Sequence, residues 1–283
     1  MAEPLPLSRE ALDDFITRTL AEDVGTGDVT AEATIPETAR FRARIAAREP
    51  LVVAGLPVAA AIVRRLAPDA EVALLVDDGA RAAPGDAVMR IEGPARALLT
   101  AERSALNVLQ HLSGIATLTR VYVDRIAGTG TRLLDTRKTI PGLRLLEKYA
   151  VKMGGGTNHR MGIYDAVLVN DIHIAVAGGV TAAVKACRAH TGLKVQVECD
   201  TLDQAREAVA AGADSLLLDN MSLDDLRAAV GFAGGRVPLE ASGGVNLDTI
   251  RGIADTGVDF ISVGRLTQSA PAVDLGMDFE SLG

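Results

Sequence analysis

Short apolar segments in the second half of the chain are each followed by polar side chains of types that take part in catalysis. These segments are residues 132–134, 166–169, 195–197, 215–218, 237–239 and 260–263. Arg137, Lys138, Glu198, Asp219 and Ser242 lie just after four of them. In β/α folds the active site lies at the carboxyl ends of the strands. Helix capping explains any single Asp or Ser at these positions, but it does not explain the basic pair Arg137 and Lys138.

Four basic residues predict a pocket for a small polyanion. Arg137, Lys138, His159 and Arg160 come from two loops around one strand–helix unit. Arginine presents a planar fork that matches carboxylate and phosphate, and lysine presents a point charge. The alternative interpretation is a solvated surface cluster.

Two glycine-rich segments predict places where backbone amides approach an anion. The first is residues 154–160, and the second, residues 242–246, is expected to open a helix after the fifth strand. Amides at a helix N-terminus form a phosphate site, and Gly264 after the last strand completes the phosphate grip of such barrels. A hinge and a tight turn are the alternatives.

Two acids, Glu198 and Asp219, follow neighbouring strands, so their carboxylates are expected to converge. Such a pair can bind Mg²⁺ near a polyphosphate, hold ribose hydroxyls or stabilise a developing cation. Paired carboxylates also occur in glycoside hydrolases. Aromatic residues make up only 3% of the chain, and this scarcity, with the basic cluster, disfavours that reading.

The elements that position these residues are alternating strands and helices. Apolar strands separated by helices predict parallel β/α units with both sheet faces covered. About six such units favour a small barrel, and an open doubly wound sheet is the rival. The first 94 residues have a mixed α+β pattern, with strands expected at 40–48, 72–76 and 87–91, and a long helix is expected over 95–126.

Composition excludes several classes of protein. The 283 residues are 48% hydrophobic and carry a net charge of −8, which disfavours binding to nucleic acid or to an anionic membrane. Two cysteines cannot form a disulfide framework, and the charged start of the chain does not read as a signal peptide. The longest apolar run, 51–63, is too short to cross a membrane. A cytoplasmic protein is therefore expected.

Several motifs together resemble the quinolinate phosphoribosyltransferase family, also called carboxylating nicotinate-nucleotide pyrophosphorylases. The most specific are Asp135 to Arg144, Lys148 to Ala150 and Gly154 to Arg160. The others are residues 22–30, 102–107, 218–220, 240–244 and 264–269. The similarity covers almost the whole chain.

The resemblance implies an α/β protein with an incomplete β/α barrel of fewer than eight strands and an N-terminal α+β sandwich domain. It places the sandwich at residues 1–113 and the barrel at 114–268, with 269–283 returning to the sandwich. It also implies transfer of phosphoribose from phosphoribosyl pyrophosphate to quinolinate with decarboxylation, in NAD biosynthesis, with Mg²⁺ as cofactor. The expected assembly is a homodimer with a shared active site, or a higher homo-oligomer.

The resemblance assigns roles to individual residues. Lys138, Glu198 and Asp219 are expected to be catalytic, with Lys138 at a phosphate and the two acids at the ribose and the metal. Arg103 is expected to reach in from the neighbouring subunit, and Arg137, His159 and Arg160 to line the carboxylates of quinolinate. The remaining residues expected to bind substrate are Thr136, Asn170, Ser242, Gly243, Gly244, Val263, Gly264, Arg265 and Gln268.

One position departs from the family pattern. The family usually reads Lys-Asp-Asn-His after the second strand, where this chain has Asn170, Asp171, Ile172 and His173. The family lysine is a cation of the substrate pocket, and losing a hydrogen bond to a charged group costs roughly 1.5–3 kcal/mol. Asn170 therefore raises two alternatives: a different acidic heterocycle as substrate, or another cation such as Lys152 or Lys185. A non-catalytic nucleotide-binding paralogue is a third hypothesis, which the retained Lys138, Glu198 and Asp219 disfavour.

Overall fold

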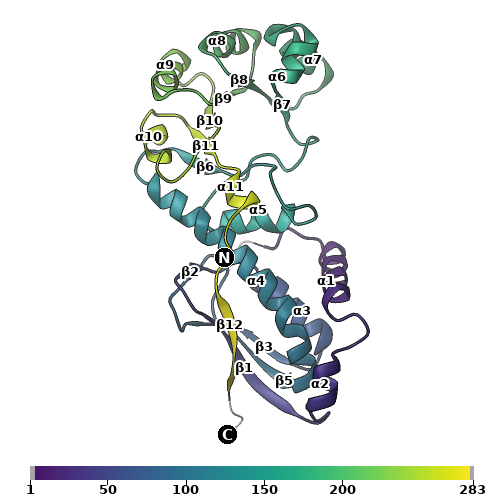
Figure 1. Ribbon diagram of the computed structural model, residues 1–283. Helices are drawn as coiled ribbons and strands as arrows, with labels where there is room; N and C mark the ends of the chain where they lie inside the picture. The colour runs from purple at the N-terminus through teal and green to yellow at the C-terminus, as the bar shows by residue number, and fades with distance from the viewer. Residues whose placement is uncertain (1–3, 281–283) are drawn as a thin grey trace. The chain divides into compact units, whose positions relative to one another are not determined.

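A computed structural model describes residues 4–280, and these residues form two compact units (Figure 1). Within the described residues, the first unit contains residues 4–120, Leu145–Gly155 and residues 269–280. The second contains Val121–Arg144 and Gly156–Gln268. Each unit is described by itself.

The first unit is built on a four-stranded antiparallel sheet in the order β12-β1-β5-β3. Its strands are β1 (Arg40–Ala47), β3 (Glu71–Leu74), β5 (Ala87–Pro94) and β12 (Leu275–Glu280). The predicted strands at 40–48, 72–76 and 87–91 are confirmed within a few residues. In β1 the apolar Phe41, Ala43 and Ile45 are buried while the arginines between them are not, because successive side chains point to opposite faces. The last strand pairs with the first, with Leu275 opposite Ala47.

Helices and a short ribbon complete this unit. The helices are α1 (Arg9–Asp23), α2 (Val29–Thr34), α3 (Leu56–Leu66), and most of α4 (Ala95–Arg125) and of α5 (Arg144–Met153). The end of α4 after Arg120 and the first residue of α5 belong to the second unit. Strands β2 (Leu51–Val52) and β4 (Arg81–Ala82) form the two-stranded ribbon. The Ser8 side chain caps the start of α1 by accepting a hydrogen bond from the Ala11 amide. The predicted long helix over 95–126 is also confirmed.

The second unit is a six-stranded parallel sheet in the order β6-β11-β10-β9-β8-β7. The strands are β6 (Arg132–Leu134), β7 (Val167–Val169), β8 (Val195–Cys199), β9 (Ser215–Asp219), β10 (Leu239–Ser242) and β11 (Phe260–Ser262). From β7 to β11 each strand adds beside its predecessor without reversal, which is the order of a barrel and not of a doubly wound sheet. Within residues 4–280 β6 and β7 do not pair, so the barrel is incomplete, with fewer than eight strands, as predicted.

Helices follow the strands of this unit. They are α6 (Asp171–Ala177), α7 (Val180–His190), α8 (Leu202–Ala211), α9 (Leu223–Ala233), α10 (Ile250–Ala254) and α11 (Arg265–Gln268). In Figure 1, α7 to α10 lie on one side of the strands, as right-handed crossovers in one direction require. A capping box opens α8, since the Thr201 side chain accepts from the Gln204 amide and the Gln204 side chain accepts from the Thr201 amide.

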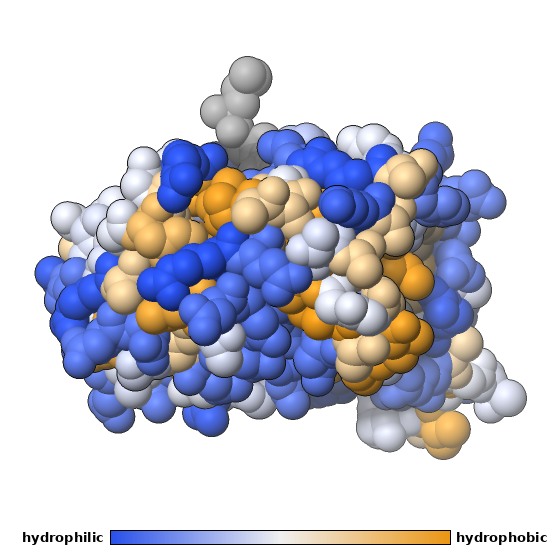
Figure 2. All heavy atoms as spheres, turned by 90° about the horizontal axis from the view of Figure 1, so that it is seen from above, coloured by the Kyte–Doolittle hydropathy of each residue, from blue (hydrophilic) through white to orange (hydrophobic). Residues whose placement is uncertain are grey.

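The face seen from the top of Figure 1 is mostly hydrophilic, with separate hydrophobic patches (Figure 2). This matches helices that turn one stripe inward: Val184 of α7, Ala205 of α8 and Leu226 of α9 are buried. Among the described residues no single helix is long and apolar enough to span a membrane, although the pair α6 and α7, bent by 92°, passes on length and composition.

Candidate active site

A polar cavity of about 440 Å³ lies at the carboxyl ends of the barrel strands. It is lined from the turns after β6, β9, β10 and β11, which meet because the strands are parallel and adjacent. Much of the set predicted from the sequence gathers here. The predicted residues that line it are Thr136, Lys138, Asp219, Ser242, Gly243, Gly244, Val263, Gly264, Arg265 and Gln268.

Glycine is required where two of these turns approach each other. Gly243 has φ +92°, and a Cβ there would overlap the side-chain amide oxygen of Asn220. The Asn220 amide donates to the Ser242 carbonyl at 2.9 Å, so the turns after β9 and β10 are stacked in contact. This approach places Asp219 and Ser242 at the same end of the cavity.

Lys138 is fixed through its backbone, while its side chain is exposed. Its amide donates to Thr136 Oγ1 at 3.0 Å, and its carbonyl accepts from Thr267 Oγ1 of α11 at 2.7 Å. Gly264 makes room for the side chain, since a Cβ at that position would lie 2.9 Å from Lys138 Cδ. The ammonium is thus carried by a rigid backbone and can move to meet an anion.

The prediction that residues 242–246 open a helix is wrong. Helix α10 begins at Ile250, and the glycines belong to the loop before it. Asn246 Oδ1 accepts from the amides of Asp248 and Thr249, which closes a local turn that resembles a helix cap in sequence. Any anion in this cavity would meet loop amides and side chains instead of a helix N-terminus.

The two acids converge as their neighbouring strands require. Burial raises the pKa of Glu198, and the negative charge of Asp219 raises it further. Asp219 accepts a hydrogen bond from Asn220 Nδ2 at 2.6 Å. Within residues 4–280 no group of three or more His, Cys, Asp or Glu side chains is placed to hold a metal ion. A pair of carboxylates fits Mg²⁺, which usually takes one or two carboxylates and completes its shell with water and substrate phosphate.

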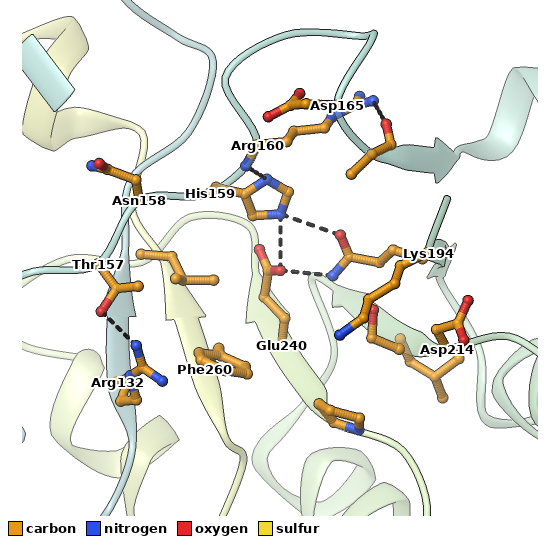
Figure 3. Close-up of a pocket in the computed structure, with 16 residues that line it drawn as sticks. Arg132, Thr157, Asn158, His159, Arg160, Asp165, Lys194, Asp214, Glu240 and Phe260 are labelled. Carbon is orange, nitrogen blue, oxygen red and sulfur yellow. Dashed lines mark hydrogen bonds and ion pairs between the residues drawn. The ribbon is translucent and has the colours of Figure 1, made fainter. Parts of the chain in front are cut away.

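A second cavity, of about 540 Å³, lies in the barrel interior. It runs from the amino ends of the strands, at Arg132, Lys194 and Phe260, to the loop with His159 and Arg160, which forms the basic end of the site. His159 and Arg160 line it together with Gln196 of β8 and Glu240 of β10 (Figure 3). The fully buried Asp135, after β6, holds the loop by accepting from the His159 amide at 2.8 Å and from Asn158 Nδ2 at 2.6 Å.

Two arginines lie close enough to interact at this end. Burial lowers the pKa of Arg160, and the like charge of Arg137 lowers it further. Arg160 Nη1 donates to the Ala166 carbonyl at 2.9 Å, which orients the guanidinium. Since Thr136 and Lys138 line the first cavity and Arg137 stands between them, this one turn links the polar and basic ends of the site.

Other predicted residues lie elsewhere. Arg137 and Glu198 line neither cavity. The charge of Arg137 acts on Arg160, which lines the interior cavity, and the charge of Asp219, which lines the polar cavity, acts on Glu198. Arg103 lies on α4, in the first unit. Asn170 caps α6: its side chain accepts from the His173 amide at 3.2 Å, and His173 Nδ1 accepts from its amide at 3.3 Å. Of the alternative cations, Lys152 belongs to α5 and Lys185 is exposed on α7.

Gln196 and Glu240 received no role from the sequence. The available signal was a single polar residue inside each of two apolar strands, Val-Gln-Val and Leu-Glu-Ala. Because side chains alternate along a strand, a polar residue between two that face the helices must point into the barrel. Glu240 is 3% exposed, so it lies in the interior.

A parallel β/α barrel with a polar, glycine-lined cavity at the carboxyl ends of its strands defines a barrel enzyme of the class that binds phosphate groups. Two family models match the chain: the N-terminal domain of quinolinate phosphoribosyl transferase over residues 28–113 and its C-terminal domain over 115–278. The chain therefore belongs to the quinolinate phosphoribosyltransferase family.

Individual relatives agree with this assignment over nearly the full length. The nicotinate-nucleotide pyrophosphorylase [carboxylating] of Mycobacterium leprae is 42% identical over 276 residues, covering 95% of this chain and 97% of the relative. A probable nicotinate-nucleotide pyrophosphorylase [carboxylating] of Bacillus subtilis is 39% identical, covering 94% and 93%. The structure of the nicotinate-nucleotide pyrophosphorylase from Francisella tularensis superposes with a TM-score of 0.94 at 40% identity, covering 99% and 100%.

Proposed function

We propose that this chain transfers phosphoribose from phosphoribosyl pyrophosphate to quinolinate and removes one carboxylate, giving nicotinate mononucleotide, pyrophosphate and CO₂. The observation that carries the proposal is the turn after β6, where Thr136 and Lys138 line the polar cavity and Arg137 acts on Arg160 at the basic end. A site with a polar end lined by glycine-rich loops and a pair of arginines suits a sugar pyrophosphate beside a dicarboxylate.

The charges support each step of this reaction. Arg137 and Arg160 would hold the substrate carboxylates, and the loops around Gly243 and Gly264 would hold phosphate. Departure of pyrophosphate leaves oxocarbenium character at the ribose, which the carboxylates of Glu198 and Asp219 would stabilise. Alkylation of the ring nitrogen then allows the ring carbon to keep the electron pair of the broken C–C bond as CO₂ departs, and that carbon takes up a proton from water. Mg²⁺, held by Glu198 and Asp219, would neutralise charge on the pyrophosphate.

The direct test combines enzyme, quinolinate, phosphoribosyl pyrophosphate and Mg²⁺ and measures CO₂ and nicotinate mononucleotide. Absence of both products at high enzyme concentration would disprove the proposal. Turnover of another acidic heterocycle in place of quinolinate would support the alternative substrate, which the comparisons do not favour. Binding of nicotinate mononucleotide without any turnover would support a non-catalytic paralogue.

We also propose a cytoplasmic homodimer, or a higher homo-oligomer, in which Arg103 enters the neighbouring subunit's site. Both cysteines are free, as expected in a reducing compartment. The test mixes Arg103→Ala with Lys138→Met, each weakly active alone. Random reassortment into dimers should restore about a quarter of wild-type activity, since half of the dimers are hybrids with one intact site. No recovery, with subunit exchange shown by mass, would contradict a shared site.

Replacing Asn170 with Lys is expected to lower the KM for quinolinate about tenfold if the pocket lacks one cation. The same change removes the cap of α6, at a cost of about 1 kcal/mol, so the melting temperature should fall by a few degrees. Steady-state kinetics and thermal melting measure the two effects. Asn170→Ser, which keeps a capping oxygen without a charge, is the control. An unchanged or higher KM in Asn170→Lys would show that the pocket is arranged differently.

A further inference from the structure

Beneath the proposed substrate pocket, three side chains from three elements form one hydrogen-bonded cluster in the barrel interior. His159 Nε2 lies 3.1 Å from Glu240 Oε2 and 3.2 Å from Gln196 Oε1. Gln196 Nε2 donates to the same Glu240 oxygen at 2.7 Å. Strands β8 and β10 are separated by β9, so Gln196 and Glu240 can meet only across the concave face of the sheet.

The other ring nitrogen of His159 fixes the direction of these bonds. The Arg160 amide donates to His159 Nδ1 at 2.9 Å, so Nδ1 is an acceptor and carries no proton. The proton of the neutral ring is then on Nε2, where it is donated to Glu240 and Gln196. Figure 3 shows the ring between Arg160 and Glu240, with Nε2 directed at the carboxylate.

The side chains of this cluster are largely buried, which limits the hydrogen bonds that the Glu240 carboxylate can make. Glu240 is 3% exposed, and the His159 side chain is 15% exposed. Glu240 Oε1 is buried and has no hydrogen-bond partner among the described residues. All of the bonding that stabilises this buried carboxylate in the described structure is therefore made through Oε2, to His159 and Gln196.

We propose that Glu240, assisted by Gln196, is a positioning residue that fixes the tautomer and orientation of His159 and, through His159 Nδ1, the backbone of Arg160. Arg160 is then presented to the substrate carboxylate from a rigid backbone. The proposal rests on the proposed function for the nature of that carboxylate. It assigns His159 a supporting role, since its two ring nitrogens bond to Arg160, Glu240 and Gln196.

The test is Glu240→Gln, which keeps the shape and removes the charge of the acceptor. The KM for quinolinate is expected to rise about tenfold, the equivalent of about 1.4 kcal/mol, while kcat and the KM for phosphoribosyl pyrophosphate stay within about twofold. The double variant Glu240→Gln with Gln196→Glu returns a carboxylate to His159 Nε2 and should recover most of the loss. A rise in KM shared equally by both substrates, or no recovery in the double variant, would indicate general damage and overturn the proposal.

A matched control exists in the first unit. Glu147 is fully buried, and its Oε1 lies 2.9 Å from His111 Nε2, so Glu147→Gln makes the same chemical change at another Glu–His pair. It should lower the melting temperature without the selective rise in quinolinate KM. An equal selective rise in this control would contradict the assignment to Glu240.

A spectroscopic measurement decides the proposal without any substrate. The chain has four histidines, so ¹⁵N NMR of the imidazoles can resolve His159. Wild type should show His159 with Nδ1 unprotonated and Nε2 protonated, and Glu240→Gln should shift its Nε2 resonance while Glu147→Gln shifts His111 instead. The opposite tautomer in wild type would overturn the proposal. A wild-type enzyme inactive on quinolinate would reject the proposed function alone, because the tautomer is read independently.

Discussion

Replacing Glu198 with Gln is expected to lower kcat by at least about 100-fold and, at pH 7, to raise the free energy of unfolding. The activity falls because a carboxylate that stabilises developing positive charge on the ribose is removed, and losing one such group typically costs 10²–10³ in rate. The stability rises because burial and the charge of Asp219 both oppose ionisation of Glu198 in the folded protein. The Glu198 carboxylate would thus lower the stability of the folded protein while it serves the reaction.

The pH dependence of that stability gain has a definite sign. The pKa of Glu198 is raised in the folded protein, whereas in the unfolded chain it is near the ordinary glutamate value of about 4.3. Below that ordinary value the group is protonated in both states and imposes no penalty. As pH rises through the folded pKa, the folded protein must hold a disfavoured charge and loses stability relative to the variant. Urea unfolding at pH 4 and pH 7 should show the Glu198→Gln advantage only at pH 7.

Glu207 of α8 provides a control of opposite sign. Hydrogen bonds from the side chain and amide of Thr181 lower the pKa of Glu207. Glu207→Gln should therefore destabilise the protein at pH 7, by an amount that fades as the pH falls below the ordinary glutamate value, and leave kcat unchanged. If Glu198→Gln destabilised the protein at pH 7, as is expected for Glu207→Gln, burial and the charge of Asp219 would not be opposing the ionisation of Glu198.

The barrel was predictable because its strands are buried on both faces. Runs such as residues 216–218 are apolar throughout, as a parallel strand covered on both faces requires, and the helices between the strands begin at ordinary caps such as Thr201 and Ser222. The start of α10 was not predictable. The Asn246 side chain bonds to amides two and three residues ahead, and this local turn has the same sequence signature as a helix cap.

The site residues at the carboxyl ends of the strands were predictable, and those in the barrel interior were not. Lys138, Asp219 and Ser242 are found together because the carboxyl ends of adjacent parallel strands coincide. The interior pair Gln196 and Glu240 depends on strand register and on curvature of the sheet, which composition does not specify. Asn170 was recognised as a missing cation, but its capping of α6 becomes visible only when the turn after β7 has a defined shape.

The second large effect is expected for Lys138→Met, which removes the ammonium and keeps most of the aliphatic stem. The KM for phosphoribosyl pyrophosphate should rise, or kcat fall, to give a loss of about 100-fold or more in kcat/KM, because a charge-assisted contact to phosphate that strengthens in the transition state is lost. The fold should be retained, since the side chain is exposed and Thr136 and Thr267 bind only the backbone of Lys138.

Gly264→Ala tests the same ammonium without removing it. The added methyl group would lie 2.9 Å from Lys138 Cδ, so the side chain must turn aside to relieve the contact. Because the aliphatic stem of Lys138 is flexible, the loss in kcat/KM should be smaller than for Lys138→Met, and the double variant should lose no more than Lys138→Met alone. Lys185→Met on the exposed face of α7 is the control for loss of a positive charge. Additive losses in the double variant would mean that Gly264 acts on the phosphate site independently of Lys138.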